Sequence, residues 1–393
     1  MQIPLSKPKV NYDKLGFELE KVFKSNWWTT GSITQQLEKE FAEYKKVKHA
    51  VAVSSCSAAL HIAVRILYDK HITHGIITTP LTFCSTINSI IHNGGTPLLI
   101  DVDKQSKCID LSNEDFKYMQ GVILVHFAGY PCNMDWIEKA RKNNVWVIED
   151  CAHSVEGLWK GQPTGTIGDI GCFSFSPTKN LAAPEMGMLI TNNDEIAEKA
   201  RVLRLHGLST DTFDRINKPG QYDIIDLGYK YNCTDIEATV ALNQLRCLED
   251  NWLRREEIWK EYQTFFHSFK TRGIFNGEYP TNEGVWFDRE PRFADESYLH
   301  GLHLFQITLN NRNDFINEMK ARGIFCGIHY NTINSFSYYQ NKYNFKMGIF
   351  PNAENFAKYC VSLPLGPGMT KDEVNYVISC IRELLETERY LFE

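Results

Sequence analysis

The 393-residue sequence lacks any apolar segment that approaches the roughly 20 residues a membrane-spanning helix needs. Its first nine residues lack the apolar core of a secretory signal peptide. It also lacks a long basic run, since 42 lysines and arginines face 48 aspartates and glutamates, for a formal net charge of −6. We therefore expect a soluble, cytoplasmic protein that binds neither membranes nor nucleic acid.

Closely spaced cysteine pairs are absent as well. The 11 cysteines are odd in number and no CxxC pair occurs among them, whereas zinc ribbons and redox dithiols need that spacing. The cysteines are therefore expected to be free thiols that serve as small buried hydrophobic residues in a reducing compartment. No metal site is predicted.

The composition is that of an ordinary globular protein, with 43% hydrophobic and 23% charged residues. Between residues 35 and 190, helical stretches alternate with short, continuously apolar segments. Apolar strands separated by helices are typical of a mostly parallel sheet covered on both faces, so the sequence predicts an α/β fold. The expected strands are 50–53, 75–79, 96–101, 122–126, 145–150, 171–174 and 187–191.

The pattern changes after residue 234. A long helical region is predicted from Thr234 through Lys270, followed by strands within 298–309 and helices at 313–322 and 371–386. We expect a large α/β domain, residues 1–250, and a smaller α+β domain, residues 251–393. The junction is expected to lie within a helix.

Three local features could carry chemistry. The first is the segment Ser54–Ala59, small residues between a strand and a helix, where unpaired backbone N–H groups can bind an anion. By itself this segment is equally well explained by a serine that caps the helix.

The second feature is an acidic residue, Asp150, at the carboxyl end of an apolar strand, where open α/β sheets present ligand-binding groups. It could be a helix cap, or a carboxylate paired with a cationic heterocycle such as the pyridinium of pyridoxal phosphate. The third feature is Lys179, in a Ser/Pro/Thr-rich turn after another strand. It could be a solvated surface lysine, or a desolvated Schiff-base lysine. The two residues are about one strand–connection–strand step apart, which allows them to meet at one edge of the sheet.

Taken together, these motifs resemble the DegT/DnrJ/StrS family of pyridoxal-phosphate sugar aminotransferases, within the fold-type-I aminotransferases. The resemblance covers nearly the whole chain and includes Trp28–Gly31, Ser54–Leu60, Asp101–Asp103, Val125–Asp135, Glu149–His153, Gly165–Lys179, Arg204–Gly207, Leu227–Asp235 and Ser362–Leu365. It implies a large domain with a mixed, mostly parallel sheet, a small C-terminal α+β domain, and a cofactor that alternates between pyridoxal and pyridoxamine phosphate.

The resemblance also implies roles for individual residues. Lys179 matches the lysine that binds the cofactor and moves the proton, and Asp150 matches the carboxylate that keeps the pyridine nitrogen protonated. Cys56, Ser57 and Ser174 fall where the family binds the cofactor phosphate. The family usually has glycine at the position of Cys56, so only its backbone amide is assigned.

Further residues are expected around the cofactor ring and the substrate. Phe83 matches an aromatic residue that stacks on the ring, with a core phenylalanine as the alternative, and His153 lies beside the ring. Asn232 matches a residue that reaches the phosphate from the partner subunit, although it could merely cap its own helix. The residues expected to contact substrate are Thr30, Gly31, His329 and Tyr330.

One position departs from the family pattern. The family usually has Glu-Gly-Gly after the lysine, whereas this chain has Glu185-Met186-Gly187, so the local backbone could differ. In related sugar dehydratases a histidine replaces the lysine. Because Lys179 is present, transamination is the better prediction.

The resemblance implies that the protein moves an amino group from L-glutamate to a keto-sugar, expected to be nucleotide-linked, for amino-sugar synthesis such as that of lipopolysaccharide or another surface polysaccharide. A homodimer with shared active sites is implied as well. Two alternatives stay open, an aminotransferase for a non-nucleotide keto-sugar acid and a non-catalytic regulatory relative.

Overall fold

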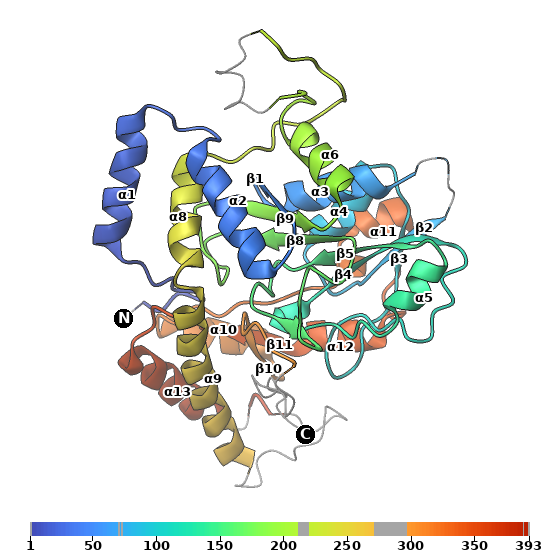
Figure 1. Ribbon diagram of the computed structural model, residues 1–393. Helices are drawn as coiled ribbons and strands as arrows, with labels where there is room; N and C mark the ends of the chain where they lie inside the picture. The colour runs from blue at the N-terminus through green and yellow to red at the C-terminus, as the bar shows by residue number, and fades with distance from the viewer. Residues whose placement is uncertain are drawn as a thin grey trace.

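The computed structural model describes residues 2–69, 71, 74–210, 220–270, 297–387 and 389–391 (Figure 1). A seven-stranded sheet in the order β1-β9-β8-β5-β4-β2-β3 forms its centre. Every neighbouring pair is parallel except those of β9, which runs antiparallel to both β1 and β8. The predicted α/β fold with a mostly parallel sheet is therefore confirmed. The strands are β1 (His49–Val53), β2 (Gly75–Thr78), β3 (Pro97–Leu99), β4 (Met119–Val125), β5 (Trp146–Asp150), β8 (Ile170–Ser174) and β9 (Gly187–Thr191).

Helices from two parts of the chain cover one face of the sheet. These are α2 (Ser32–Lys45) and α8 (Asp235–Leu245), and α1 (Tyr12–Ser25) packs against α8 on the same side of the molecule (Figure 1). Leu37 and Phe41 of α2 and Ala238 of α8 pack against Phe173 and Met188 of the strands. These side chains come from positions three or four apart, because one stripe of each amphipathic helix faces the sheet.

The opposite face carries α3 (Cys56–Leu67), α4 (Cys84–His92) and α6 (Asp194–Arg204). Apolar side chains of α3 and α6 pack there against Val51, Ile148 and Leu189. At the β2–β4 end of the sheet, α5 (Ile137–Lys142) and α12 (Pro351–Tyr359) share a core with Val122 and Leu124. Strands covered on both faces explain why their sequences are continuously apolar.

The helical region predicted from Thr234 to Lys270 divides into two helices. The first, α8, begins at a Thr234–Glu237 capping box and ends at Leu245, and α9 runs from Leu248 to Lys270. At the break, the N–H of Cys247 bonds to the carbonyl of Gln244 at 3.1 Å, a tighter turn than an α-helix has. The apolar spacing continues across so short a turn, so the sequence pattern alone did not reveal it.

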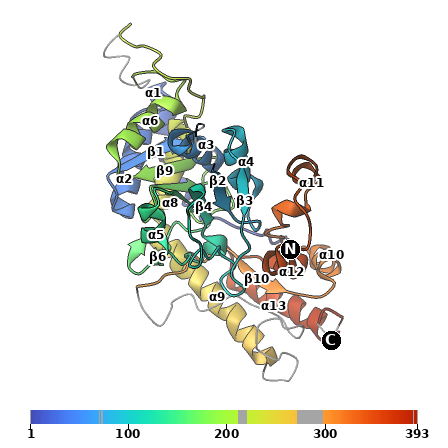
Figure 2. The same cartoon turned by 90° about the vertical axis from the view of Figure 1, so that its right-hand side faces the viewer.

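A second layer lies at the end of the molecule opposite α6 (Figure 2). Here β10 (Phe305–Thr308) pairs antiparallel with β11 (Cys360–Leu363) beneath α9, α10 (Arg312–Ala321) and α13 (Lys371–Leu385). Of the strands predicted within 298–309, only β10 forms, since Leu299 makes a single bridge to Leu158. The shorter elements are η1 (Phe127–Gly129), the β6–β7 hairpin (Leu158–Trp159 and Gln162–Pro163), η2 (Ile333–Ser335) and α11 (Ser337–Tyr343).

The chain's two parts are closely joined. Helix α9 runs through the predicted boundary at residues 250/251, and Ile3 packs in the same core as Trp259 and Phe305. The division into two domains stays a prediction.

Candidate active site

A cavity of about 380 Å³ opens at the carboxyl ends of the parallel strands. The last residues of β4, β5 and β8, namely Val125, Asp150 and Ser174, all line it. Parallel strands place their carboxyl ends along one edge of the sheet, and this is where α/β proteins bind ligands. The predicted residues that the structure brings together here are Cys56, Ser57, Phe83, Asp150, His153, Ser174, Lys179, His329 and Tyr330.

Lys179 projects from a turn that the backbone closes. The Lys179 N–H bonds to the carbonyl of Ser176 at 2.9 Å, and the N–H of Ala183 bonds back to Phe175 at 2.7 Å. The side chain is half-buried, and within the described residues its Nζ has no hydrogen-bond or ion-pair partner. Burial lowers the pKa of Lys179 to about 8, against the opposing influence of Cys56 and Asp150. An unpaired amine with such a pKa is suited to attack a carbonyl carbon and to carry a proton near neutral pH.

Asp150 faces the same cavity and is only 3% exposed. Its Oδ2 accepts a hydrogen bond from Thr86 Oγ1 at 2.8 Å, and its Oδ1 accepts one from the Ala152 N–H at 3.1 Å. Burial nevertheless raises the pKa of Asp150 above its usual value. A buried carboxylate of this kind is stabilised in its ionised form when a cation lies in front of it.

The N-terminus of α3 lines another wall of the cavity. Cys56 and Ser57 are the first two residues of α3, so their backbone N–H groups lack an acceptor within the helix. A Cβ atom at Gly187 would lie 2.3 Å from the carbonyl carbon of Ser55, so only glycine lets β9 pass this close to the turn. Unpaired N–H groups at the positive end of a helix dipole, with the Ser57 and Ser174 hydroxyls nearby, form an anion-binding site.

Neutral aromatic side chains form the remaining wall. His153 accepts a hydrogen bond from the Ala128 N–H on Nδ1, so its Nε2 carries the proton and donates to Tyr330 Oη at 2.9 Å. Burial holds the pKa of His153 well below its usual value and lowers the pKa of His329 to about 4. Phe83 stands at the mouth, with 57% of its surface exposed and its ring 5.9 Å from that of Tyr330. The wall is therefore uncharged and offers flat surfaces for a planar ring.

Thr30, Gly31 and Asn232 lie outside this cavity. Thr30 Oγ1 donates to the carbonyl of Cys233 at 2.6 Å and accepts from Asn232 Nδ2 at 2.9 Å. The Gly31 N–H bonds to Asp235 Oδ1 at 2.9 Å, at the point where α2 and α8 begin. These residues meet one another at helix ends and do not line the cavity of their own chain, so their role in substrate binding stays a prediction.

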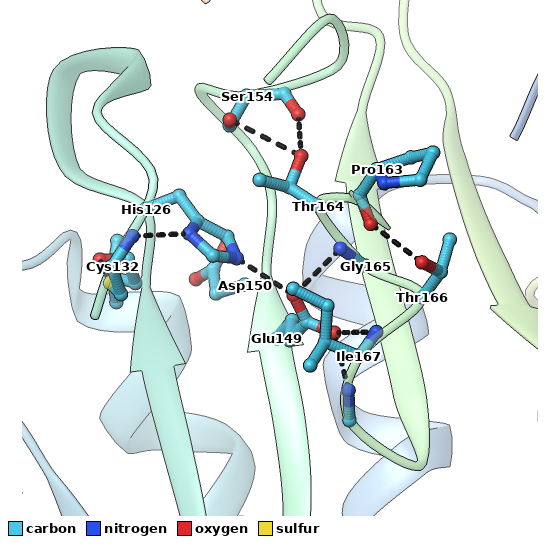
Figure 3. A network of polar contacts seen from close by, with 12 residues as sticks. His126, Cys132, Glu149, Asp150, Ser154, Pro163, Thr164, Gly165, Thr166 and Ile167 are labelled. Atoms are coloured by element: carbon cyan, nitrogen blue, oxygen red, sulfur yellow. Dashed lines mark hydrogen bonds and ion pairs between the residues drawn. The ribbon is translucent and has the colours of Figure 1, made fainter. Parts of the chain in front are cut away.

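Glu149 supports the site from behind (Figure 3). Its oxygens accept hydrogen bonds from the backbone N–H groups of Gly165, Ile167 and Gly168 at 2.6–2.7 Å and from His126 Nε2 at 2.9 Å. Burial alone would raise the pKa of Glu149, but these bonds hold it below the usual value. With Cys151, Glu149 and His126 form a compact cluster of metal-binding residue types. Because the side chains of Glu149 and His126 already bond to each other, and Glu149 also bonds to the backbone N–H groups before β8, the cluster anchors the loop that precedes this strand.

Met186 does not disturb the cavity, although it stands where a glycine was expected. Its side chain is fully buried among Phe173, Phe175 and Met188, on the face of the sheet that α2 and α8 cover. The close approach to α3 is made by the next residue, Gly187.

Sequence reasoning did not single out Ser6, Thr86, Glu185 or His303. Thr86 bonds to Asp150, and the other three line the cavity. His303 comes just before β10, more than a hundred residues from Lys179, and no local motif marks it. Only the position of Glu185, directly before the Met-Gly step after the lysine, was a signal in the sequence.

A family model described as the DegT/DnrJ/EryC1/StrS aminotransferase family matches residues 13–382. The chain belongs to this family. Its members depend on pyridoxal phosphate, and the predicted fold-type-I architecture is confirmed. The chain is 37% identical over 399 residues to the spore coat polysaccharide biosynthesis protein SpsC of Bacillus subtilis, covering 98% of this chain and 97% of SpsC. It is 36% identical to the uncharacterized protein MJ1066 of Methanocaldococcus jannaschii, covering 98% of each chain.

Solved structures agree with this assignment. The putative sugar aminotransferase Spr1654 of Streptococcus pneumoniae superposes with a TM-score of 0.85 at 26% identity, over 98% of this chain. Spr1654 has been solved in an apo-form, a PLP-form and a PMP-form. The superpositions cover 98%, 99% and 100% of the Spr1654 chain, respectively.

No helix within the described ranges has both the length and the hydropathy to cross a bilayer.

Proposed function

We propose that this protein is a pyridoxal-phosphate-dependent aminotransferase that moves an amino group from L-glutamate to a nucleotide-linked keto-sugar. One observation supports this most strongly, namely the unpaired Lys179 amine in the same cavity as the buried Asp150. A buried structural lysine would be expected to have a partner, whereas within the described residues the Lys179 amine has none.

The residues of the cavity fit the cofactor. The first turn of α3, with the hydroxyls of Ser57 and Ser174, would hold the phosphate; Asp150 would face the ring nitrogen; and Phe83 and His153 would flank the ring. When bound, pyridoxal phosphate supplies an electron sink for the carbanion formed at the substrate carbon.

Lys179 is the group in the cavity best suited to transfer the proton. Its pKa of about 8 allows the amine to give up and regain a proton near neutral pH. Asp150 stays ionised when a positive ring nitrogen lies in front of it, and so it would hold the proton on that nitrogen. The neutral His153–Tyr330 pair would orient the ring without adding charge.

For the substrate, we propose a keto-sugar carried by a nucleotide and used for amino-sugar synthesis, such as that of lipopolysaccharide or another surface polysaccharide. The name of SpsC, a spore coat polysaccharide biosynthesis protein, supports the second part of this proposal. His329 and Tyr330 would contact the sugar, since both line the cavity and neither is charged. A non-nucleotide keto-sugar acid is the alternative substrate, and a panel of both kinds, with 2-oxoglutarate release as the signal, decides between them.

We expect L-glutamate alone to convert the loaded protein. One equivalent of 2-oxoglutarate per site should appear without any sugar, as the cofactor becomes pyridoxamine phosphate. Absorption spectroscopy and 2-oxoglutarate detection follow the reaction, and Lys199→Ala, which removes an exposed lysine on α6, is a matched control that should behave as wild type. Cofactor binding without any 2-oxoglutarate would show instead a regulatory relative that only binds.

We also propose a homodimer in which Asn232 reaches the partner's cavity. Asn232 is half-buried, donates to Thr30 Oγ1 at 2.9 Å and does not line the cavity of its own chain. The segment before it exposes large apolar side chains, with Ile224 66% and Leu227 83% exposed. Exposed apolar surface of this kind is typical of protein–protein interfaces.

Subunit mixing tests this arrangement. Lys179→Ala and Asn232→Asp are each expected to be inactive alone. In a mixed dimer one site carries both substitutions and the other carries neither, so a 1:1 mixture should regain about a quarter of wild-type activity after exchange. Native mass spectrometry would confirm the exchange. Exchange without any recovery of activity, or a fully active monomer, would contradict the shared site.

A further inference from the structure

Next to Lys179 in the sequence, Asn180 belongs to a continuous network of buried polar side chains. Asn180 Nδ2 donates to both oxygens of Glu156 at 3.0 and 2.9 Å, and to the carbonyl of Gly301 at 2.5 Å. Asn180 Oδ1 pairs with His303 Nδ1 at 3.2 Å. Every hydrogen-bonding atom of the Asn180 side chain therefore has a partner, so its position is fully determined.

This network of side chains continues to the cavity wall. The ring of His303 stacks on that of His153, with centroids 4.4 Å apart and planes at 28°. His153 in turn donates to Tyr330. Asn180, Glu156, His153 and His303 are each no more than 7% exposed. Movement of any of these side chains would leave a neighbouring buried polar group without its hydrogen bond, and this makes the network rigid.

Two cations act on Glu156, at the opposite end of this network from Tyr330. Burial raises the pKa of Glu156 to about 7, and the positive charge of Arg255 in α9 opposes this rise. Arg255 is 1% exposed and donates from Nη1 to the carbonyl of Leu365 at 3.1 Å. Lys45 of α2 acts on Glu156 in the same sense and donates to the carbonyl of Val155 at 3.1 Å. The network of side chains thus connects the part of the molecule with the large sheet to the C-terminal layer.

We infer that Glu156 and Asn180 are a positioning pair that holds the Lys179 turn and the His303–His153 stack in register with the cofactor ring. This inference rests on the proposed function. Asn180 directly follows Lys179, so fixing its side chain fixes the peptide from which the Lys179 amine projects. Through His303 the same side chain also fixes the wall on which the ring would lie.

Asn180→Ala tests the inference. We expect kcat to fall about 10- to 100-fold, as small displacements of reacting groups do, while the KM for glutamate changes less than about threefold. In the resting protein, the pH midpoint of the absorption band of Lys179-bound cofactor should shift by about 0.5 unit or more, since the amine is no longer held in place. Borohydride fixation at Lys179, measured by mass spectrometry, should slow in parallel.

Four further variants separate positioning from stability. Glu156→Ala should act like Asn180→Ala, and the double variant should be little worse than either, because both substitutions break one network. Glu156→Gln keeps an acceptor for Asn180 and should restore most of the rate. Gln120→Ala is the matched control, because Gln120 is equally buried and bonds to the backbone of Asp69 at the far end of β4. It should lower the Tm and leave the spectrum unchanged.

A purely structural pair would give a different result. Asn180→Ala would then lower the Tm as Gln120→Ala does, with kcat and the spectral midpoint as in wild type, and the inference would be wrong. If Asn180→Ala does not fold, Glu156→Ala is judged by the same two outcomes. Failure of borohydride to fix cofactor to Lys179 in the wild type would instead overturn the proposed function itself.

Discussion

We expect Lys179→Ala to abolish transamination while leaving the fold intact. The substitution removes the unpaired amine of the cavity, and with it both the attachment point for the cofactor and the group that moves the proton. The turn should persist, because it is closed by backbone hydrogen bonds from Lys179 and Ala183. Steady-state release of 2-oxoglutarate and the Tm, both compared with wild type, check this result.

Removal of Lys179 should not destabilise the fold. Burial lowers the pKa of Lys179, so the folded protein disfavours its charged form and gains when the amine is removed. Lys199→Ala again serves as control and should keep full activity. A Lys179→Ala protein that retained even a tenth of wild-type transamination would refute the role given to this lysine.

Asp150→Asn is expected to lower the rate about 10²- to 10³-fold, with a smaller loss of cofactor affinity. The neutral amide cannot hold a proton on the ring nitrogen, and an interaction of a few kcal/mol corresponds to a rate change of this size. The local structure tolerates the change, since Thr86 Oγ1 can accept from the new amide as well as donate, and Thr82 Oγ1 lies 2.7 Å away to complete the exchange. Single-turnover rates with glutamate, together with cofactor titration, measure the two effects separately.

The alternative for Asp150 is a structural one. As a turn acceptor for the Ala152 N–H alone, it would be replaceable by asparagine without a change in rate. A rate within about threefold of wild type would favour that role. A large loss of Tm together with the lost rate would point to folding, and circular dichroism on the same sample distinguishes the two cases.

Local chemistry in the sequence marked positions where a site could lie, and the resemblance to a known family assigned their roles. Asp150 and Ser174 end apolar strands, and Cys56 begins a helix directly after another. Strand ends and helix starts follow from periodicity over a few residues, and parallel strands present such ends at one edge. The sequence by itself therefore determined the α/β fold and the edge at which a cavity was to be expected, while the choice of Asp150, Ser174 and Cys56 as site residues came from the family motifs that the sequence carries.

Tertiary structure alone decided the rest. The break between α8 and α9 is hidden in the sequence by a continuous apolar pattern. Thr30 and Gly31 lie outside the cavity because they bond to residues that are remote in sequence. The contacts of Thr86, His303 and Asn180 likewise join residues that are far apart along the chain. Periodicity reports which face of an element is buried, but not which side chain it meets there. Hydrogen bonds and desolvation depend on that second fact, so the pKa of Lys179 and the unpaired state of its amine could be known only from the packed structure.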